Sequence, residues 1–359
     1  MQQSHRLDWV DAAKGLSIIL VVMMHSAYGV GEDMNGVGAL HYAIGWATPF
    51  RMPEFFLIAG LFLGQVVGRP WLHFADRRIV HYLYFYALWV VLQILFKVAL
   101  GTGDLGAAAL QVLWATIEPY GVLWFIYLLA VSGLVVKLLH EARVPHWPVL
   151  LVAAVLQMLH VRTGISTLDH FADYFVFFYA GYAAAPAIFR LVAVAERHAL
   201  AASGLLLLYG VALGLLVFAG GATLLPRGMQ MGYAAWPGLN LLLGLAGAVA
   251  VCVAAALLLR LKGMGWLRWL GVHSLMIYVS FSIPMAASRT LLLRLGVSDD
   301  VTVVSVAVML VALTAPLAVY WLVSRTGVGR FLFERPEWAH LPGAPGSAAG
   351  RRAGAVPAE

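Results

Sequence analysis

The sequence predicts an all-α integral membrane protein, a helical bundle that crosses the bilayer many times. Of its 359 residues, 62% are hydrophobic and 11% are charged, whereas a soluble domain carries about 25% charged residues. The mean hydropathy is +0.87. The apolar residues are gathered into long runs, and a helix needs about 20 such residues to span a membrane. These observations exclude an ordinary soluble fold.

The apolar runs predict about ten transmembrane helices. They cover approximately 14–31, 44–67, 80–100, 119–138, 147–161, 171–189, 199–220, 237–259, 266–290 and 301–323. The fifth run is short, so a tilted or re-entrant segment fits it as well as a full span. The stretch 105–117 is too short to cross a bilayer, and we expect it at the membrane interface.

The basic residues predict the orientation of these spans. With the N-terminus in the cytoplasm, 17 of the 23 Lys and Arg residues fall in cytoplasmic segments, five fall on the opposite side, and Lys97 lies within a span. This bias agrees with the positive-inside rule. The basic residues that give the net charge of +6 are therefore explained by the orientation of the protein in the membrane. No nucleic-acid partner is expected. We predict a multi-pass protein of the cell (inner) membrane with both termini in the cytoplasm.

The chain reads as one membrane domain, residues 1–335, followed by a cytoplasmic tail, 336–359. The tail is rich in Ala, Gly and Pro and is expected to be disordered. The first apolar run lacks a small-residue cleavage pattern, so we expect it to remain as a span. The lone Cys252 provides neither a disulfide nor a cysteine metal site. No set of His, Asp and Glu residues has metal-ligand spacing, so no metal is expected.

A one-sided polar stripe runs along the first predicted helix. Lys14 and His25 are eleven positions apart, which places them within roughly 20° of one direction and roughly 16 Å apart along the axis. Asp11 lies near the same face, at a spacing where it can pair with Lys14. An ionisable residue inside an apolar run is a functional-site hypothesis by default. Lys14 alone would also fit a snorkelling interfacial residue.

The second polar stretch opens the second predicted span. Arg51 and Glu54 lie three positions apart on either side of Pro53, which suits the first turn of a helix. We predict that Glu54 meets His25 and orients its imidazole, as a third group commonly does for a catalytic base. A structural pair between Glu54 and Arg51 is the alternative. Gly60 and Gly64 form a small-xxx-small pair that lets another helix approach closely.

These motifs resemble those of the acyltransferase 3 family of membrane acyltransferases. The family opens with a basic residue and a His eleven positions later, as in Asp11-x-x-Lys14-Gly followed by His25. A second family motif is similar to Met52-Pro53-x-Phe55-Phe56-x-x-x-Gly60. Later blocks resemble Leu123-Trp124-Phe125, Phe177-Phe178-x-x-Gly181 and Gly271-x-x-Ser274-x-x-Ile277-Tyr278. The resemblance covers about residues 6–325, and the branch it is most similar to contains fucose 4-O-acetylase-like and glucan-succinylating proteins.

The resemblance implies a transferase for groups other than aminoacyl groups. It would move an acetyl or succinyl group from cytoplasmic acyl-CoA to a hydroxyl of an extracytoplasmic glycan or related acceptor, and so modify a polysaccharide. Acyl-CoA would be the donor substrate, and no permanently bound cofactor is expected. His25 would be the general base, acting by direct transfer or through an acyl-His. Lys14, Arg77 and Arg78 would hold the phosphates of coenzyme A, although the two arginines also fit simple topology determinants.

Five further residues are candidates for substrate binding. His170 and Asp173 are expected near the outer end of the sixth span, where an acceptor sugar or simple helix capping would explain them. Trp124 and Tyr278 could contact a sugar or the acyl group. Arg51 is the remaining candidate, at a position where family members often have His. Many members also carry His where this chain has Phe281, so the acceptor side is the less defined half of the predicted site.

Two other classes of protein remain open from the sequence. A membrane transporter or flippase for a glycan or small solute would also use many helices and a charged central stripe. A structural membrane scaffold would need neither Lys14 nor His25. The sequence does not specify the acyl group, the acceptor or the oligomeric state.

Overall fold

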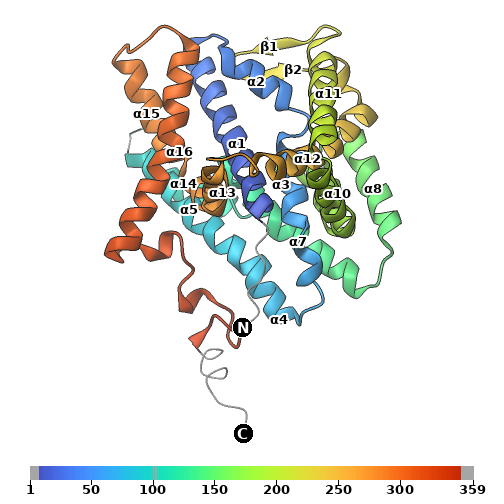
Figure 1. Cartoon of the computed structure of the whole chain (residues 1–359). Helices are drawn as coiled ribbons and strands as arrows, with labels where there is room; N and C mark the ends of the chain where they lie inside the picture. Colours follow the sequence, from blue (N-terminus) through green and yellow to red (C-terminus); the bar gives the residue numbers. More distant parts are fainter. Residues whose placement is uncertain (1–7, 100, 102, 349–359) are drawn as a thin grey trace.

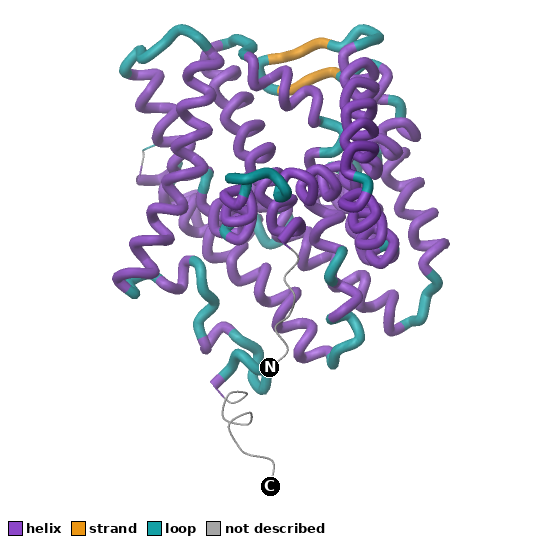
Figure 2. The backbone as a smooth tube through the Cα atoms, viewed as in Figure 1, coloured by secondary structure: helices purple, strands orange, loops and turns teal. Residues whose placement is uncertain are grey.

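The computed structural model describes residues 8–99, 101 and 103–348, and in this part the chain is mostly helical (Figures 1 and 2). The helices are α1 (Asp8–Met34), α2 (Ala39–Ala47), α3 (Arg51–Gly60), α4 (Trp71–Phe74), α5 (His81–Ala99), α6 (Leu105–Trp114), α7 (Trp124–Glu141), α8 (His146–Leu159), α9 (Ser166–Ala183), α10 (Ala185–Arg197), α11 (Ala199–Phe218), α12 (Pro237–Leu258), α13 (Gly265–Val272), α14 (Ser274–Ser280), α15 (Ser282–Arg294) and α16 (Val301–Thr326). A π-helix, Ala75–Val80, joins α4 to α5. The two strands, β1 (Thr223–Leu225) and β2 (Gly228–Gln230), form an antiparallel hairpin.

The described helices confirm an all-α membrane protein. Within the described residues, six segments are long and apolar enough to cross a membrane: Asp8–Met34, Trp71–Ala99, Gly121–Glu141, Ala199–Phe218, Pro237–Leu258 and Val301–Thr326. Two bent pairs, α9 with α10 and α14 with α15, raise this number to eight if each pair is one span. Helix α8 is apolar but shorter. The count of ten spans and the cytoplasmic placement of the termini stay predictions.

Three of the predicted spans are broken in the structure. The run 44–67 divides into α2 and α3, and Pro49 lies in the break between them. The run 171–189 bends by 73° where α9 gives way to α10, whose first turn contains Pro186. The run 266–290 divides into α13, α14 and α15, with a 55° bend between the last two. Proline cannot donate a helix hydrogen bond, which explains the first two breaks.

Helix α1 lies in the middle of the bundle and contacts α13, α16, α12, α2 and α3 (Figure 1). Its contact with α13 depends on two glycines. A Cβ atom on Gly271 would lie 1.6 Å from the carbonyl oxygen of Asp11, and one on Gly15 would lie 2.2 Å from that of Leu267. The backbones therefore touch directly, which only glycine permits.

Helix α3 packs against α9 in the same way. A Cβ atom on Gly60 would lie 2.1 Å from the carbonyl oxygen of Phe178, and one on Gly181 would lie 2.1 Å from that of Leu57. Gly60 therefore has the close-packing role that its spacing predicts. Gly64 does not, because its nearest neighbour would be a Tyr182 side-chain atom at 3.8 Å.

The segment after α16 folds back onto the π-helix through an ion-pair network. Asp76 is 2% exposed, and its carboxylate accepts from Arg335 Nη2 at 2.5 Å and from the Leu341 backbone N–H at 2.8 Å. His340 Nδ1 lies 3.0 Å from the same carboxylate. Residues 336–348 thus differ from the disordered tail that their composition predicts. An ion pair with a distant segment cannot be recognised from composition alone. The rest of the predicted tail, 349–359, lies outside the described residues.

The β-hairpin covers the other end of the bundle, beside α2 (Figure 1). His41 Nε2 lies 3.0 Å from the carbonyl oxygen of Pro226 in the hairpin turn, and Arg227 pairs with Glu32 near the end of α1. At the same end, the Asp300 carboxylate caps α16 by accepting from the backbone N–H of Thr302. This hydrogen bond to the Thr302 N–H holds the pKa of Asp300 below its usual range.

Candidate active site

Two cavities lie along the same side of α1 and share three aromatic residues. The first contains Lys14 and the second contains His25, and we call them the Lys14 cavity and the His25 cavity. The side chains that line both are Phe55, Phe125 and Tyr278. The stripe predicted on α1 therefore faces two neighbouring spaces that meet at an aromatic wall.

The Lys14 cavity has a volume of about 380 Å³, and basic side chains lie together on its polar side. Lys14 lies there with its Nζ atom 3.4 Å from Asp11 Oδ1, as the i, i+3 spacing predicts. Arg78, His81 and Tyr82 line the same space, and Arg78 Nη1 lies 3.5 Å from the Tyr82 hydroxyl. Positive and hydrogen-bonding groups so arranged can bind a phosphate.

The π-helix separates the two predicted arginines. Arg78 turns into the Lys14 cavity, whereas Arg77 is exposed and does not line it. Neighbouring residues of a helix point in different directions, and π-helical turns are frequent at functional sites. The structure thus brings Lys14 and Arg78 together and leaves Arg77 outside.

The His25 cavity is smaller, about 120 Å³, and mostly apolar. Its lining comprises Val21, Met24, His25, Arg51, Met52, Phe55, Val122, Trp124, Phe125, Tyr174 and Tyr278. His25 is half-buried, and its ring lies 5.4 Å from that of Phe281. Among the described residues, no side chain or backbone group makes a hydrogen bond with the imidazole. Its nitrogens are therefore available to a substrate.

Glu54 is not brought to the imidazole. It is fully buried and does not line the His25 cavity. Neither carboxyl oxygen has a hydrogen-bond partner among the described residues. The Ser17 hydroxyl lies beside the carboxyl group but donates to the Ala13 carbonyl oxygen at 2.8 Å. The pairing of Glu54 with His25 stays a prediction that this geometry does not support.

Arg51 is placed beside His25, in the wall of the same cavity. It begins α3, directly after the break between α2 and α3. Its Nε and Nη1 atoms are buried and have no hydrogen-bond partner, and no carboxylate lies within 4.0 Å of its nitrogens in the part of the chain that the structure describes. The alternative pairing of Arg51 with Glu54 is thus not formed as an ion pair.

Two stacked rings, Trp124 and Tyr174, line the side of the His25 cavity that faces α9, whereas His170 does not line the cavity. Trp124 stacks on His170, with the ring centroids 4.3 Å apart and the planes 15° apart. Tyr174, one turn further along α9, stacks on Phe56 at 5.1 Å. Flat rings of this kind are suited to contact a sugar or an acyl chain. The two predicted residues Trp124 and His170 therefore belong to one cluster.

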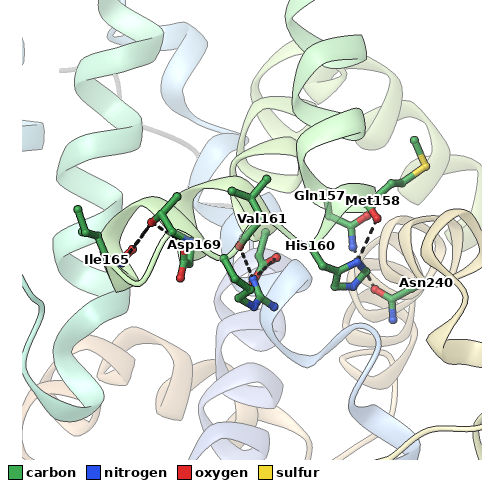
Figure 3. A network of polar contacts seen from close by, with 10 residues as sticks. Gln157, Met158, His160, Val161, Ile165, Asp169 and Asn240 are labelled. Carbon is green, nitrogen blue, oxygen red and sulfur yellow. Dashed lines mark hydrogen bonds and ion pairs between the residues drawn. The ribbon is translucent and has the colours of Figure 1, made fainter.

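Asp173 forms an ion pair with a residue outside this cluster. It pairs with Arg162, with 3.1 Å between Arg162 Nη1 and Asp173 Oδ2. Arg162 comes from the turn that joins α8 to α9, whose polar contacts Figure 3 shows. In that turn, the Asp169 carboxylate accepts from the Thr163 backbone N–H at 2.7 Å. The structural reading of Asp173, as a residue that fixes the rim, fits this geometry best.

Tyr278 lies at the centre of the aromatic wall between the two cavities. Its hydroxyl donates to the carbonyl oxygen of Val122, and its ring packs edge-on against Phe125 at 5.5 Å. Phe55 packs in the same manner against Phe125 at 5.1 Å. These contacts hold the three rings in place.

Sequence reasoning missed several cavity residues. Tyr174 could have been found from its spacing, because it follows His170 by four residues on one helical face. His81 similarly follows Arg78 by three residues. Phe125 stands in a recognised motif, but nothing in its spacing to Phe55 or Tyr278 shows that the three rings meet. Only the packing of α3, α7 and α14 brings them together.

One of the comparisons with known proteins shows the family. The model of a family described as an acyltransferase domain, the acyltransferase 3 family, matches residues 7–325. This range covers most of the chain, both cavities and the motifs around Lys14 and His25. No curated protein and no solved structure matches the chain. The protein is therefore a membrane acyltransferase that belongs to the acyltransferase 3 family.

Proposed function

We propose that this enzyme moves an acyl group, acetyl or succinyl, from acyl-CoA to a hydroxyl of a glycan or related acceptor. The observation that carries the proposal is the pair of cavities that meet at Phe55, Phe125 and Tyr278. One cavity has cations suited to phosphates and the other has an accessible imidazole. A donor and an acceptor that enter from opposite ends would meet at the shared wall.

The Lys14 cavity is the proposed donor site. Lys14 and Arg78 would bind phosphates of coenzyme A by charge-assisted hydrogen bonds. Arg77, which is exposed, would add only long-range attraction. The pantetheine arm would then carry the thioester along α1 toward His25, roughly 16 Å away by helical rise. With the predicted orientation, this entrance faces the cytoplasm of a cell (inner) membrane.

The His25 cavity is the proposed reaction site. The imidazole would accept the proton of the acceptor hydroxyl, and the hydroxyl oxygen would attack the thioester carbonyl carbon. The carbon–sulfur bond would break, and the proton would pass from His25 to the departing thiolate of coenzyme A. Trp124, His170 and Tyr174 would provide flat surfaces for the acceptor. Transfer through an acyl-His uses the same groups.

The test is a His25→Ala variant of the full-length chain in lipid nanodiscs, assayed for release of coenzyme A and, in cells, for glycan acylation by mass spectrometry. General-base catalysis contributes about 10²–10⁴-fold, so we expect acylation to fall by at least about 100-fold while membrane insertion and thermal stability are retained. Full activity in this variant would overturn the mechanism. Movement of a solute into vesicles that contain the protein, with no acyl-CoA present, would favour a transporter instead.

A further inference from the structure

The guanidinium of Arg51, in the wall of the proposed reaction site, has no hydrogen-bonded or ion-paired counterion, and the buried Glu54 carboxyl acts on it only through space. The guanidinium makes no hydrogen bond or ion pair with any described residue, and no ring in that part of the chain lies under it in a cation–π contact. No Asp or Glu is among the described residues that line the His25 cavity. A charge in such an environment is costly unless it is paired.

The position of Arg51 on the backbone adds to this cost. It is the first residue of α3, and the N-terminus of a helix carries a partial positive charge that disfavours a cation. Glu54, one turn later, would be the natural partner, but no Arg51–Glu54 ion pair is formed. An anion bound inside the cavity would offset both unfavourable effects, the lack of an ion-paired partner and the position of the cation at the positive end of the helix.

The size of the cavity limits what that anion is. A volume of about 120 Å³ has room for only a few non-hydrogen atoms next to His25. The anion is therefore a group that belongs to one of the substrates and lies close to the carbonyl that reacts. A planar guanidinium recognises a carboxylate by two parallel hydrogen bonds. A neutral acyl group such as acetyl would leave Arg51 unpaired.

We propose that Arg51 binds a carboxylate that enters the His25 cavity with the substrates. This inference deepens the proposed acyl transfer and rests on it. The distal carboxylate of a dicarboxylic acyl group, such as succinyl, is the source that the small cavity favours. A carboxylate on the acceptor is the second source of the same chemistry.

The test compares two donors of equal chain length, succinyl-CoA and butyryl-CoA, with the full-length protein in nanodiscs. Hydrogen bonds to a charged group are worth about 1.5–3 kcal/mol, so the wild type should prefer succinyl-CoA in kcat/KM by about tenfold or more. Arg51→Gln should abolish this preference, and Arg51→Lys should retain part of it. Arg227→Gln, which removes an exposed arginine paired with Glu32, is the matched control and should leave the preference unchanged.

A second part of the experiment tests whether the carboxylate belongs to the acceptor. Wild type and Arg51→Gln are assayed with one donor and either a neutral glucose oligosaccharide or one that contains glucuronic acid. A loss confined to the acidic oligosaccharide assigns the carboxylate to the acceptor. Unchanged selectivity for donors and acceptors in Arg51→Gln would overturn the proposal.

A direct binding measurement tests the carboxylate site at Arg51 independently of acyl transfer. Monomethyl succinate, which carries one carboxylate, should raise the melting temperature of the wild type but not that of Arg51→Gln, and neutral methyl butyrate should raise neither. If no donor releases coenzyme A with the wild type but this shift is seen, the acyl-transfer proposal fails and the carboxylate site stands. If the wild type shows neither the shift nor a preference for an acidic donor or an acidic acceptor, the Arg51 proposal fails.

Discussion

At the scale of single residues, helical spacing alone indicates that Lys14 and His25 share one face of α1, and each lines a cavity there. Their roles in donor binding and catalysis stay predictions. The sequence could not predict which of two adjacent arginines faces the site. Adjacent residues of a helix point in different directions, and which of the two faces the cavity depends on how the π-helix packs against the bundle. The sequence also could not place Glu54, because spacing along α3 does not reveal that this carboxyl group is buried beside Ser17 and outside the lining of the His25 cavity.

The two adjacent arginines provide a matched pair of variants. We expect Arg78→Gln to raise KM for acyl-CoA by about tenfold, because one charge-assisted hydrogen bond to phosphate is worth about 1.5 kcal/mol. Arg77→Gln should change KM by less than about twofold, since an exposed charge is screened by salt. Initial rates across a range of acyl-CoA concentrations measure both. Equal effects of the two substitutions would argue against the proposed donor site.

Glu54 provides a second test at this scale. Its carboxyl group lies outside the His25 cavity, so we expect Glu54→Gln, which keeps the shape of the side chain, to change kcat by less than about tenfold. A base that loses its orienting partner would be expected to lose about 10²-fold or more. Steady-state kcat with saturating acyl-CoA distinguishes the two. A large loss would restore the predicted pairing of Glu54 with His25.

At the scale of elements, the apolar runs located the helices but did not reveal where they break. Hydropathy averages over a run, whereas a break depends on one proline or on a packed turn. The break between α2 and α3 is the most important, because it places Arg51 inside the bundle beside His25. A continuous helix over 44–67 would have placed that arginine near a membrane surface.

The contact between α3 and α9 should be sensitive to a single methyl group. In Gly60→Ala, the new Cβ atom would lie 2.1 Å from the Phe178 carbonyl oxygen, so the helices must separate. We expect a loss of about 1–3 kcal/mol, the usual cost of overpacking, seen as a lower melting temperature in detergent. Gly133→Ala in α7 is the control, because a Cβ atom there meets nothing within 4 Å. Equal stability of the two variants would contradict the close packing.

At the scale of the whole molecule, the sequence predicted the fold class and the family correctly, because both depend on composition and on motifs spread along the chain. Contacts between distant segments were beyond it. The ion-pair network of Asp76, Arg335 and His340 joins residues more than 250 positions apart. Nothing in the local pattern around either segment indicates this contact.

Release of that contact should be measurable. Asp76→Asn leaves Arg335 buried without its partner charge, and the loss of one member of a buried pair costs about 3–5 kcal/mol. We expect faster cleavage at Glu334 and Glu337 by a glutamate-specific protease and a higher KM for acyl-CoA, because Arg78 belongs to the same π-helix. Glu32→Gln, which breaks an exposed pair with Arg227, is the control. Unchanged cleavage in Asp76→Asn would show that the segment is held by other contacts.

The wall formed by Phe55, Phe125 and Tyr278 has a consequence for the cell as well as for the chemistry. With the predicted orientation, one cavity would open toward each membrane surface, and such a protein risks becoming a leak through which protons and ions dissipate the membrane potential. The Tyr278 hydroxyl is taken up by the Val122 carbonyl oxygen, so the three packed rings would separate the two cavities by a mainly apolar barrier while the acyl group is transferred. The enzyme would thus couple two compartments chemically and keep them insulated from each other.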